Sequence, residues 1–418
     1  MPIGPDRPVP STSGLRWPRP GIQTYLYSAT ACWGISVGLL SATLPFRFQQ
    51  LGLPIVEYGL ALAAYAGGML LTESVWGALA FRLGRPRPIV AVGIVVGGAT
   101  LLLAFATTFP AFLGAEALIG ALGVYLAPLL RWVALSSGGP GSAGSGTGRW
   151  SSVFGLGLAI GVSVGPVGFV IFGFRDVALL SIVALGVAVA VAAALPWSLA
   201  SLPPATRGRP LAVRTLATRP FLVALLLVLI AFIAMTFTTN FLQYFSIVLF
   251  GGTPSEAGYV LGAGRLVTLA AAFGLGTVVD RWGPGRAIPA GFLLLLMGGV
   301  ATWVSRSFDE MVAATLLFSA GLGWLSASLL PLAVDAMPLD HQGAAIGVFG
   351  SMEDMGLLVG PLLFGSVWAW YGPTSIFPVV TALGAAGLAA SLVVAPRGAS
   401  APPATPEARD TSSAARDL

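Results

Sequence analysis

Six ionisable side chains stand inside long apolar stretches of this 418-residue sequence. They are Glu73, Glu116, Arg131, Arg265, Glu353 and Asp354. An ionised group at the centre of a bilayer costs roughly 2.5 to 3.5 kcal/mol on insertion scales, so such residues are candidates for function. A carboxyl group at that depth can bind and release a proton, and an arginine can hold or modulate it.

Position along the apolar stretches ranks these candidates. Arg265, Glu353 and Asp354 lie deep, and an ion pair between Arg265 and one carboxylate would remove most of the cost of burial. One hypothesis is that this carboxylate exchanges a proton while Arg265 modulates it, and a permanent structural ion pair is the alternative. Adjacent helix positions point about 100° apart, so the two acids cannot both face one partner. Glu73 and Arg131 lie nearer the ends of their stretches, where reaching the membrane interface is the alternative to a function.

The elements that position these residues must be membrane-spanning helices. The chain is 56% hydrophobic and 9% charged, whereas an average soluble domain is about 25% charged. A helix crosses a bilayer with about 20 apolar residues. Such stretches predict twelve spans, beginning near residues 24, 58, 88, 110, 150, 177, 221, 256, 286, 311, 343 and 374.

Missing residue types exclude several kinds of chemistry. All 21 basic residues are arginines, and without lysine there is no phosphate-binding P-loop and no Schiff base. One cysteine and one histidine cannot form an internal disulfide or a histidine metal cluster. The pattern GxSxG occurs at 34–38 and 161–165, but both copies lie in apolar helices away from the single histidine. We therefore expect no enzyme, no cofactor, no metal site and no nucleic-acid partner.

The distribution of arginine predicts the topology. With twelve spans, sixteen of the 21 arginines fall on the side of the two tails, three on the other side and two within spans. Arginine-rich loops stay in the cytoplasm, so both termini are expected there, in a bacterial inner membrane. The predicted organisation is a disordered tail (1–20), a six-helix bundle (21–200), a cytoplasmic linker (201–219), a second six-helix bundle (220–396) and a second disordered tail (397–418).

The two bundles are predicted to be a parallel repeat. At an offset of 199 residues, six polar or glycine positions coincide, namely Glu57 with Glu256, Gly59 with Gly258, Gly77 with Gly276, Arg82 with Arg281, Gly84 with Gly283 and Arg87 with Arg286. At an offset of 195, Gly161, Gly165 and Pro166 coincide with Gly356, Gly360 and Pro361.

Two stretches around these coincidences resemble the loop motif GxxxDRxGR of the major facilitator superfamily. The residues concerned are Gly77, Arg82, Gly84 and Arg85 after span two, and Gly276, Asp280, Arg281, Gly283 and Arg286 after span eight. The resemblance implies an all-α fold of twelve transmembrane helices in two pseudo-symmetric bundles, with a central cavity lined by spans one, four, seven and ten. It also implies a secondary transporter that alternates between inward-facing and outward-facing states.

The loop motif departs from the family at Phe81, which stands where the family has aspartate. The second copy, with Asp280, Arg281 and Arg286, is therefore the better candidate for a charged latch at the cytoplasmic face. The alternative is that the arginines serve topology alone.

A second motif implies export. Gly161, Gly165 and Pro166 in span five resemble the GxxxGP motif of the family's proton-linked exporters, and Gly356, Gly360 and Pro361 repeat it in span eleven. A Gly-Pro step bends a helix, and the glycines allow close packing, which would seal one end of a cavity. Generic helix packing explains the motif nearly as well. Glu116 takes the place where those exporters carry an arginine, so it would bind a proton or attract a cationic substrate.

Polar groups that would face the cavity are few. Candidates for substrate binding are Tyr25 and Trp33 in span one and Asn240, Gln243 and Tyr244 in span seven. An apolar cavity with few hydrogen bonders suits a lipophilic solute better than a sugar. Helix packing and interfacial anchoring are the alternatives for these residues.

The leading hypothesis is a secondary active transporter that exports a small lipophilic molecule in exchange for protons. Its expected partners are the solute, protons and the bilayer, and it is expected to be a monomer. An uptake carrier or uniporter for a metabolite is the second hypothesis. A non-transporting membrane sensor or scaffold is the third.

Overall fold

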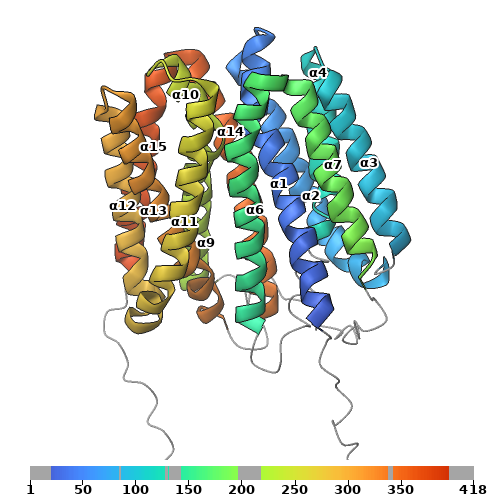
Figure 1. Ribbon diagram of the computed structural model, residues 1–418. Helices are drawn as coiled ribbons and strands as arrows, with labels where there is room; N and C mark the ends of the chain where they lie inside the picture. Colours follow the sequence, from blue (N-terminus) through green and yellow to red (C-terminus); the bar gives the residue numbers. More distant parts are fainter. Residues whose placement is uncertain are drawn as a thin grey trace, which may run out of the picture.

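The computed structural model is a bundle of helices (Figure 1) and describes residues 20–83, 86–127, 130, 143–195, 218–337 and 342–394. These residues contain no strand. Eleven helices among them are long and apolar enough to cross a membrane, and a twelfth, Phe109–Gly123, is shorter. The predicted fold class, all-α with twelve helices in two pseudo-symmetric bundles, is confirmed.

The helices begin within a few residues of the predicted spans. In the first half of the chain they are α1 (Pro20–Gln50), α2 (Ile55–Leu83), α3 (Pro86–Phe105), α4 (Phe109–Gly123), α6 (Ala143–Phe172) and α7 (Phe174–Ala193). In the second half they are α9 (Arg219–Thr236) continued by the π-helix η2 (Phe237–Phe241) and α10 (Leu242–Val248), then α11 (Pro254–Trp282), α12 (Pro284–Val304), α13 (Phe308–Asp335), α14 (Gln342–Tyr371), the 3-10 turn η4 (Pro373–Ser375) and α15 (Ile376–Val394).

The repeat extends to the boundaries of the helices. α2 and α11 begin and end 199 residues apart, and so do α6 and α14. The turns repeat as well, because Gly52 and Gly251 have φ of 65° and 66°, and Gly173 and Gly372 have φ of 85° and 87°. Only glycine adopts such angles at no steric cost. The same left-handed turn therefore closes equivalent helix pairs in both halves.

The Gly-Pro steps do not sit at equivalent positions. Because α6 and α14 repeat at 199 residues, the position equivalent to Pro166 is Gly365, and Pro361 lies four residues before it. Four residues are about one helical turn, so the proline keeps nearly the same face while moving along the helix axis. The 195-residue offset therefore reflects a displacement by one turn within a 199-residue repeat.

Glycines set the contact between α1 and α6. A Cβ atom at Gly34 would lie 2.5 Å from the carbonyl oxygen of Phe154, and one at Gly161 would lie 2.5 Å from that of Ile35. Gly38 packs on the same stretch of α6, with its added Cβ 2.9 Å from the Cα of Gly161. Small residues at this spacing let two membrane helices approach to backbone contact. Both GxSxG patterns thus serve helix packing.

Two helix pairs join the halves, α2 with α14 and α6 with α11, and the second pair stands at the centre of Figure 1. We call the end of the bundle where α1 begins the tail end, and the end with the turns at 51–54 and 249–253 the loop end. Towards the loop end, a Cβ at Gly59 would lie 2.5 Å from the carbonyl oxygen of Pro361. A Cβ at Gly258 would lie 2.9 Å from the ring of Pro166. The halves therefore meet at backbone distance on this side.

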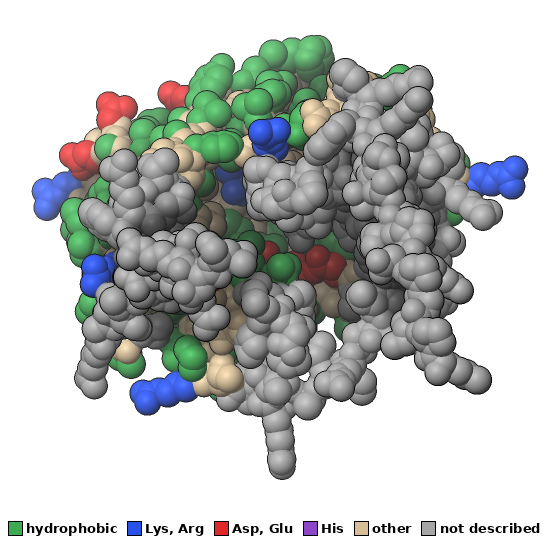
Figure 2. Space-filling model, turned by 90° about the horizontal axis from the view of Figure 1, so that it is seen from below, with side chains coloured by type: hydrophobic (Ala, Val, Ile, Leu, Met, Phe, Trp, Pro, Cys, Tyr) green, Lys and Arg blue, Asp and Glu red, His purple; other side chains and the backbone are tan. Residues whose placement is uncertain are grey.

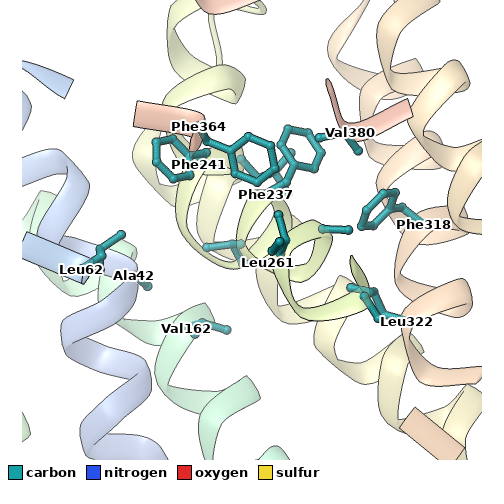
Figure 3. Close-up of a cluster of buried hydrophobic side chains, with 14 of the residues drawn as sticks. Ala42, Leu62, Val162, Phe237, Phe241, Leu261, Phe318, Leu322, Phe364 and Val380 are labelled. Atoms are coloured by element: carbon teal, nitrogen blue, oxygen red, sulfur yellow. The ribbon is translucent and has the colours of Figure 1, made fainter. Parts of the chain in front are cut away.

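One hydrophobic core runs through both halves. In Figure 3, Phe237, Phe241 and Phe364 gather around η2, and Ala42, Leu62 and Val162 lie on the helices of the first half. The ring of Phe237 contacts the rings of Phe245, Phe318, Phe364 and Phe377 at centroid distances of 5.6 to 6.4 Å. Aromatic packing thus fixes the seventh span against α13, α14 and α15.

Candidate functional site

The seventh span contains a π-helix in the stretch expected to bind substrate. The backbone N–H of Leu242 donates to the carbonyl of Phe237, five residues earlier. Around this turn the hydroxyls of Thr236, Thr238 and Thr239 donate to backbone carbonyls within the same helix. Such bonds compete with the regular helical pattern. Single π-turns inside helices are frequent at functional sites.

A hydrogen bond joins the two halves at this turn. The hydroxyl of Tyr58, on α2, donates to the backbone carbonyl of Asn240 at 3.0 Å. The Tyr58 ring also packs against Phe241 and Tyr244, with both pairs of centroids 5.7 Å apart. Tyr58 is fully buried. This contact therefore closes the space between α2 and the seventh span.

Replacing Tyr58 by phenylalanine is expected to loosen this closure. The change removes one hydrogen bond but keeps the ring, and a bond of this kind contributes about 1 kcal/mol, or about fivefold in an equilibrium. A cysteine that replaces Asn240 in a Cys32→Ser background reports how open the space between α2 and the seventh span is. It keeps the backbone carbonyl that accepts the Tyr58 hydrogen bond. Its labelling by a membrane-impermeant maleimide from the loop end should rise by about the same factor.

The matched control is Tyr259→Phe, since the Tyr259 ring is 61% exposed on the outer surface of α11. It should leave the labelling rate unchanged. Equal rates in the Tyr58 and Tyr259 variants would show that the Tyr58 hydroxyl does not hold the halves together.

The other candidates for substrate binding fall into two groups. Gln243 is 1% exposed, and neither atom of its amide has a hydrogen-bond partner within the described chain, as is also true of the Tyr244 hydroxyl. Such groups cost about 1 to 3 kcal/mol each when left unsatisfied. Trp33 packs on Phe154 at 4.7 Å, and Tyr25 is 45% exposed near the tail end. Gln243 and Tyr244 therefore fit a binding role better than the two residues of α1.

Carboxylates from both halves converge on one side chain of α2. Glu116, on α4, is 7% exposed and Asp354, on α14, is 5% exposed. Both lie within Coulombic range of the Tyr65 hydroxyl, and Glu116 also interacts with Tyr58. Among the described residues, no hydrogen bond or ion pair reaches the Glu116 carboxylate.

α2 and α4 hold Glu116 in place through glycines. The backbone of Gly120, one turn after Glu116, lies directly against the backbone of Tyr65. A Cβ at Gly68 would in turn lie 2.6 Å from the carbonyl oxygen of Ala117. This close contact fixes the stretch of α4 that carries Glu116 against α2.

Glu73 and Glu353 extend the acidic path towards the tail end. Glu73 is half-buried on α2 and faces α14, where a Cβ at Gly350 would lie 3.9 Å from one of its carboxylate oxygens. Glu353 is half-buried on α14 beside Asp354. Viewed from below in Figure 2, acidic side chains lie set back near the centre of the tail-end face. Of these two acids, Glu73 thus lies at the seam between α2 and α14.

Arg265 is placed elsewhere, in a crevice inside the second half. Its neighbours there include Thr238, Thr315 and Ser319. The crevice measures about 10 Å³, which is about the space of one water molecule. Hydroxyl groups of its own half therefore surround Arg265, and its pairing with Glu353 or Asp354 stays a prediction.

The charged loop motif is described only in part. Gly283 precedes α12 with φ of 76°, and Arg286 is exposed in the first turn of that helix. The remaining positions lie outside the residues whose side chains are described, namely Gly77, Arg82, Gly84, Arg85, Gly276, Asp280 and Arg281. Arg131 lies outside the described residues as well.

The glycines of the helix-bend motifs all lie at helix contacts. Gly161 and Gly165 face α1, and Gly356 and Gly360 face Phe232 and Thr236 of α9. Pro166 and Pro361 face the other half, against Gly258 and Gly59. The motif therefore has two functions in the fold, packing within a half through its glycines and contact between halves through its prolines.

Two residues of the site were missed in the sequence. Tyr58 and Tyr65 lie on one face of α2, in an apolar stretch where a tyrosine gives no signal of its own. Their spacing of seven residues, about two helical turns, places both on one face of α2, and this spacing was available in the sequence.

The comparisons with known proteins agree on the family. A family model described as Major Facilitator Superfamily matches residues 26–302 and 227–417. The chain is 26% identical over 130 residues to the riboflavin transporter RibZ of Clostridioides difficile, covering 31% of the chain and 28% of the relative. It is 26% identical over 125 residues to citrate exporter 1 of Aspergillus niger, covering 29% and 23%. These matches span less than a third of the relatives' lengths.

Solved structures show the same fold. The nucleoside transporter NupG superposes with a TM-score of 0.76 at 12% identity, over 89% of this chain and 99% of that one. The human organic anion transporter MFSD10 superposes with a TM-score of 0.65 at 16% identity, over 90% and 100%. At such identities the likeness concerns the arrangement of helices alone.

Proposed function

The chain belongs to the Major Facilitator Superfamily, and from that premise we propose that it is a proton-coupled exporter of a small lipophilic molecule, working by alternating access. A transporter of small molecules follows from the family and its relatives. Beyond this, we propose that transport is coupled to protons, that its direction is export and that the solute is lipophilic.

We propose that the tail end faces the cytoplasm, because arginine concentrates on that side of the predicted topology. The two six-helix bundles, 21–200 and 220–396, are proposed to rock about their contacts. The loop end is closed by Gly59 on Pro361, Gly258 on Pro166 and the bond from Tyr58 to Asn240. The proposed starting state is therefore open to the cytoplasm.

The observation that supports proton coupling is the convergence of two carboxylates near Tyr65. Glu116 comes from the first half and Asp354 from the second, and Tyr65 interacts with both. Rocking of the halves changes the distance between these acids and their access to water. A proton bound on one side can then be released on the other, which links its movement to that of the solute.

The proposed solute is apolar with few hydrogen-bonding groups. The seventh span offers the amide of Gln243 and the hydroxyl of Tyr244 among aromatic rings. A polar group of the solute would satisfy one of these atoms while its apolar part contacts the rings.

Proteoliposomes loaded with a lipophilic fluorescent dye test this function. We expect dye movement against its gradient only when a pH gradient is imposed, in the direction opposite to proton flow. Dye movement that is the same with and without a pH gradient would identify a uniporter. Dye movement in the same direction as protons would identify an uptake carrier. No movement in purified protein that binds the dye would favour a sensor.

A further inference from the structure

An apolar groove lies on the outer surface of the first half, away from the proposed transport path. It runs between α3 and α7, which stand together at the edge of the bundle in Figure 1. Its volume is about 390 Å³, and all eleven residues that line it are apolar. α3 and α7 contact each other, so the groove is a gap within a formed helix pair.

Glycines form the floor of the groove. At its tail-end side the helices touch, since a Cβ at Gly93 would lie 2.6 Å from the side chain of Val189. Further along, a Cβ at Gly98 or Gly186 would meet no atom within 4 Å, and one at Gly97 would be 3.9 Å from Ile182. The helices therefore diverge, and the missing side chains expose the backbone to whatever fills the gap.

The groove has the dimensions of a hydrocarbon chain. From Val90 to Leu101 it extends along α3 for about 16 Å, at about 1.5 Å per residue. That is about half of the hydrocarbon thickness of a bilayer, the depth of one leaflet. The rims are formed by side chains such as Ile94, which is 69% exposed. An apolar trough about one leaflet deep suits an acyl chain, which runs along the same direction in the bilayer.

A cation stands at the loop-end mouth of the groove. Phe105 lies one turn beyond Leu101 on α3, and Arg175 one turn beyond Leu179 on α7. The guanidinium carbon of Arg175 sits 4.6 Å from the centre of the Phe105 ring, so a cation–π contact bridges the two helices there. This holds the positive charge in place above the apolar trough.

We propose that this groove is a binding site for a membrane phospholipid, with one acyl chain between α3 and α7 and its phosphate on Arg175. The apolar lining provides the chain's environment, and the guanidinium matches the charge of the phosphate. The site is separate from the α2–α14 seam, so the proposal does not depend on what the protein transports.

Photocrosslinking and native mass spectrometry test the site directly. A phospholipid with a photoreactive group in its acyl chain, reconstituted with the full chain, is expected to label peptides containing Ile94, Gly98 or Ile182. Gly98→Leu and Gly186→Leu fill the trough without backbone clashes. Each should lower retained phospholipid by about tenfold, because the side chain displaces several methylene contacts.

Arg175→Gln is expected to weaken retention by about fivefold, as for one basic residue at a lipid surface. The matched controls are Gly114→Leu, at an exposed glycine of α4 with open space around it, and Arg306→Gln, at an exposed arginine of the same end. Both should retain phospholipid like the unaltered protein.

Equal retention in the groove variants and controls, or labelling spread evenly over the lipid-facing helices, would overturn the proposal. It would also be overturned if Gly98→Leu converted a dimer to a monomer, since a second copy would then be the occupant. Displacement of the photolipid by a transported dye would identify the groove as an entry route for solute instead.

Discussion

Gly120→Leu is expected to prevent stable packing of the first half. The Gly120 backbone lies directly against the backbone of Tyr65, where any side chain would meet a carbonyl that cannot rotate away. Overpacking costs about 1 to 3 kcal/mol where side chains can adjust, so a clash with backbone should reach at least about 3 kcal/mol. The apparent Tm of the detergent-purified protein should fall by about 6 to 12 °C.

Gly114→Leu provides the control, because it places the same side chain on the same helix where no atom lies within 4 Å. Its Tm should stay close to that of the unaltered protein. Equal losses in the two variants would mean that helix α4 tolerates leucine nowhere. No loss in either would mean that α2 and α4 do not meet at Gly120.

Glu116→Gln is expected to uncouple transport from protons. Glutamine keeps the size and polarity of the side chain, so folding should survive, but it cannot carry the proton. Dye accumulation driven by a pH gradient should drop by roughly tenfold or more, a usual size for coupling between two sites. Exchange of labelled for unlabelled dye at equilibrium should persist, because it needs no net proton movement.

Asp354→Asn tests whether the second carboxylate acts with the first. If the pair shares one proton step, the double variant should lose no more accumulation than either single variant. Asp309→Asn, at an exposed acid in the first turn of α13, is the control and should transport normally. Full pH-driven accumulation in Glu116→Gln would remove this acid from the proton pathway.

It could be predicted that this is a helical membrane protein with an internal repeat, because composition indicates the first and residue spacing indicates the second. The scarcity of charge requires lipid-facing helices, and the pairs Gly59 with Gly258 and Gly84 with Gly283 disclose the 199-residue period. The turn pairs Gly52 with Gly251 and Gly173 with Gly372 were equally visible. Because the chain has 55 glycines, the sequence does not show which of them form turns with positive φ, and the structure does.

The partners of the intramembrane charges could not be predicted. Position along a helix gave the depth of Arg265 and Asp354 but not the side they face, because that depends on how the helices pack. The structure turns Arg265 towards Thr315 and Ser319 inside its own half. The charge of Asp354 acts on the Tyr65 hydroxyl of the other half. The pairing of Arg265 with a carboxylate therefore stays a prediction.

The central claim is that the loop end opens as the tail end closes, and paired spin-label distances test it most directly. In a Cys32→Ser background, one pair joins Gln50 and Val248 at the loop end, and another joins Gln23 and Val393 near the tail end, all exposed positions on opposite halves. When dye is added or the pH is changed, the Gln50–Val248 distance should lengthen while the Gln23–Val393 distance shortens. Distances that stay fixed, or that change in the same sense, would contradict alternating access.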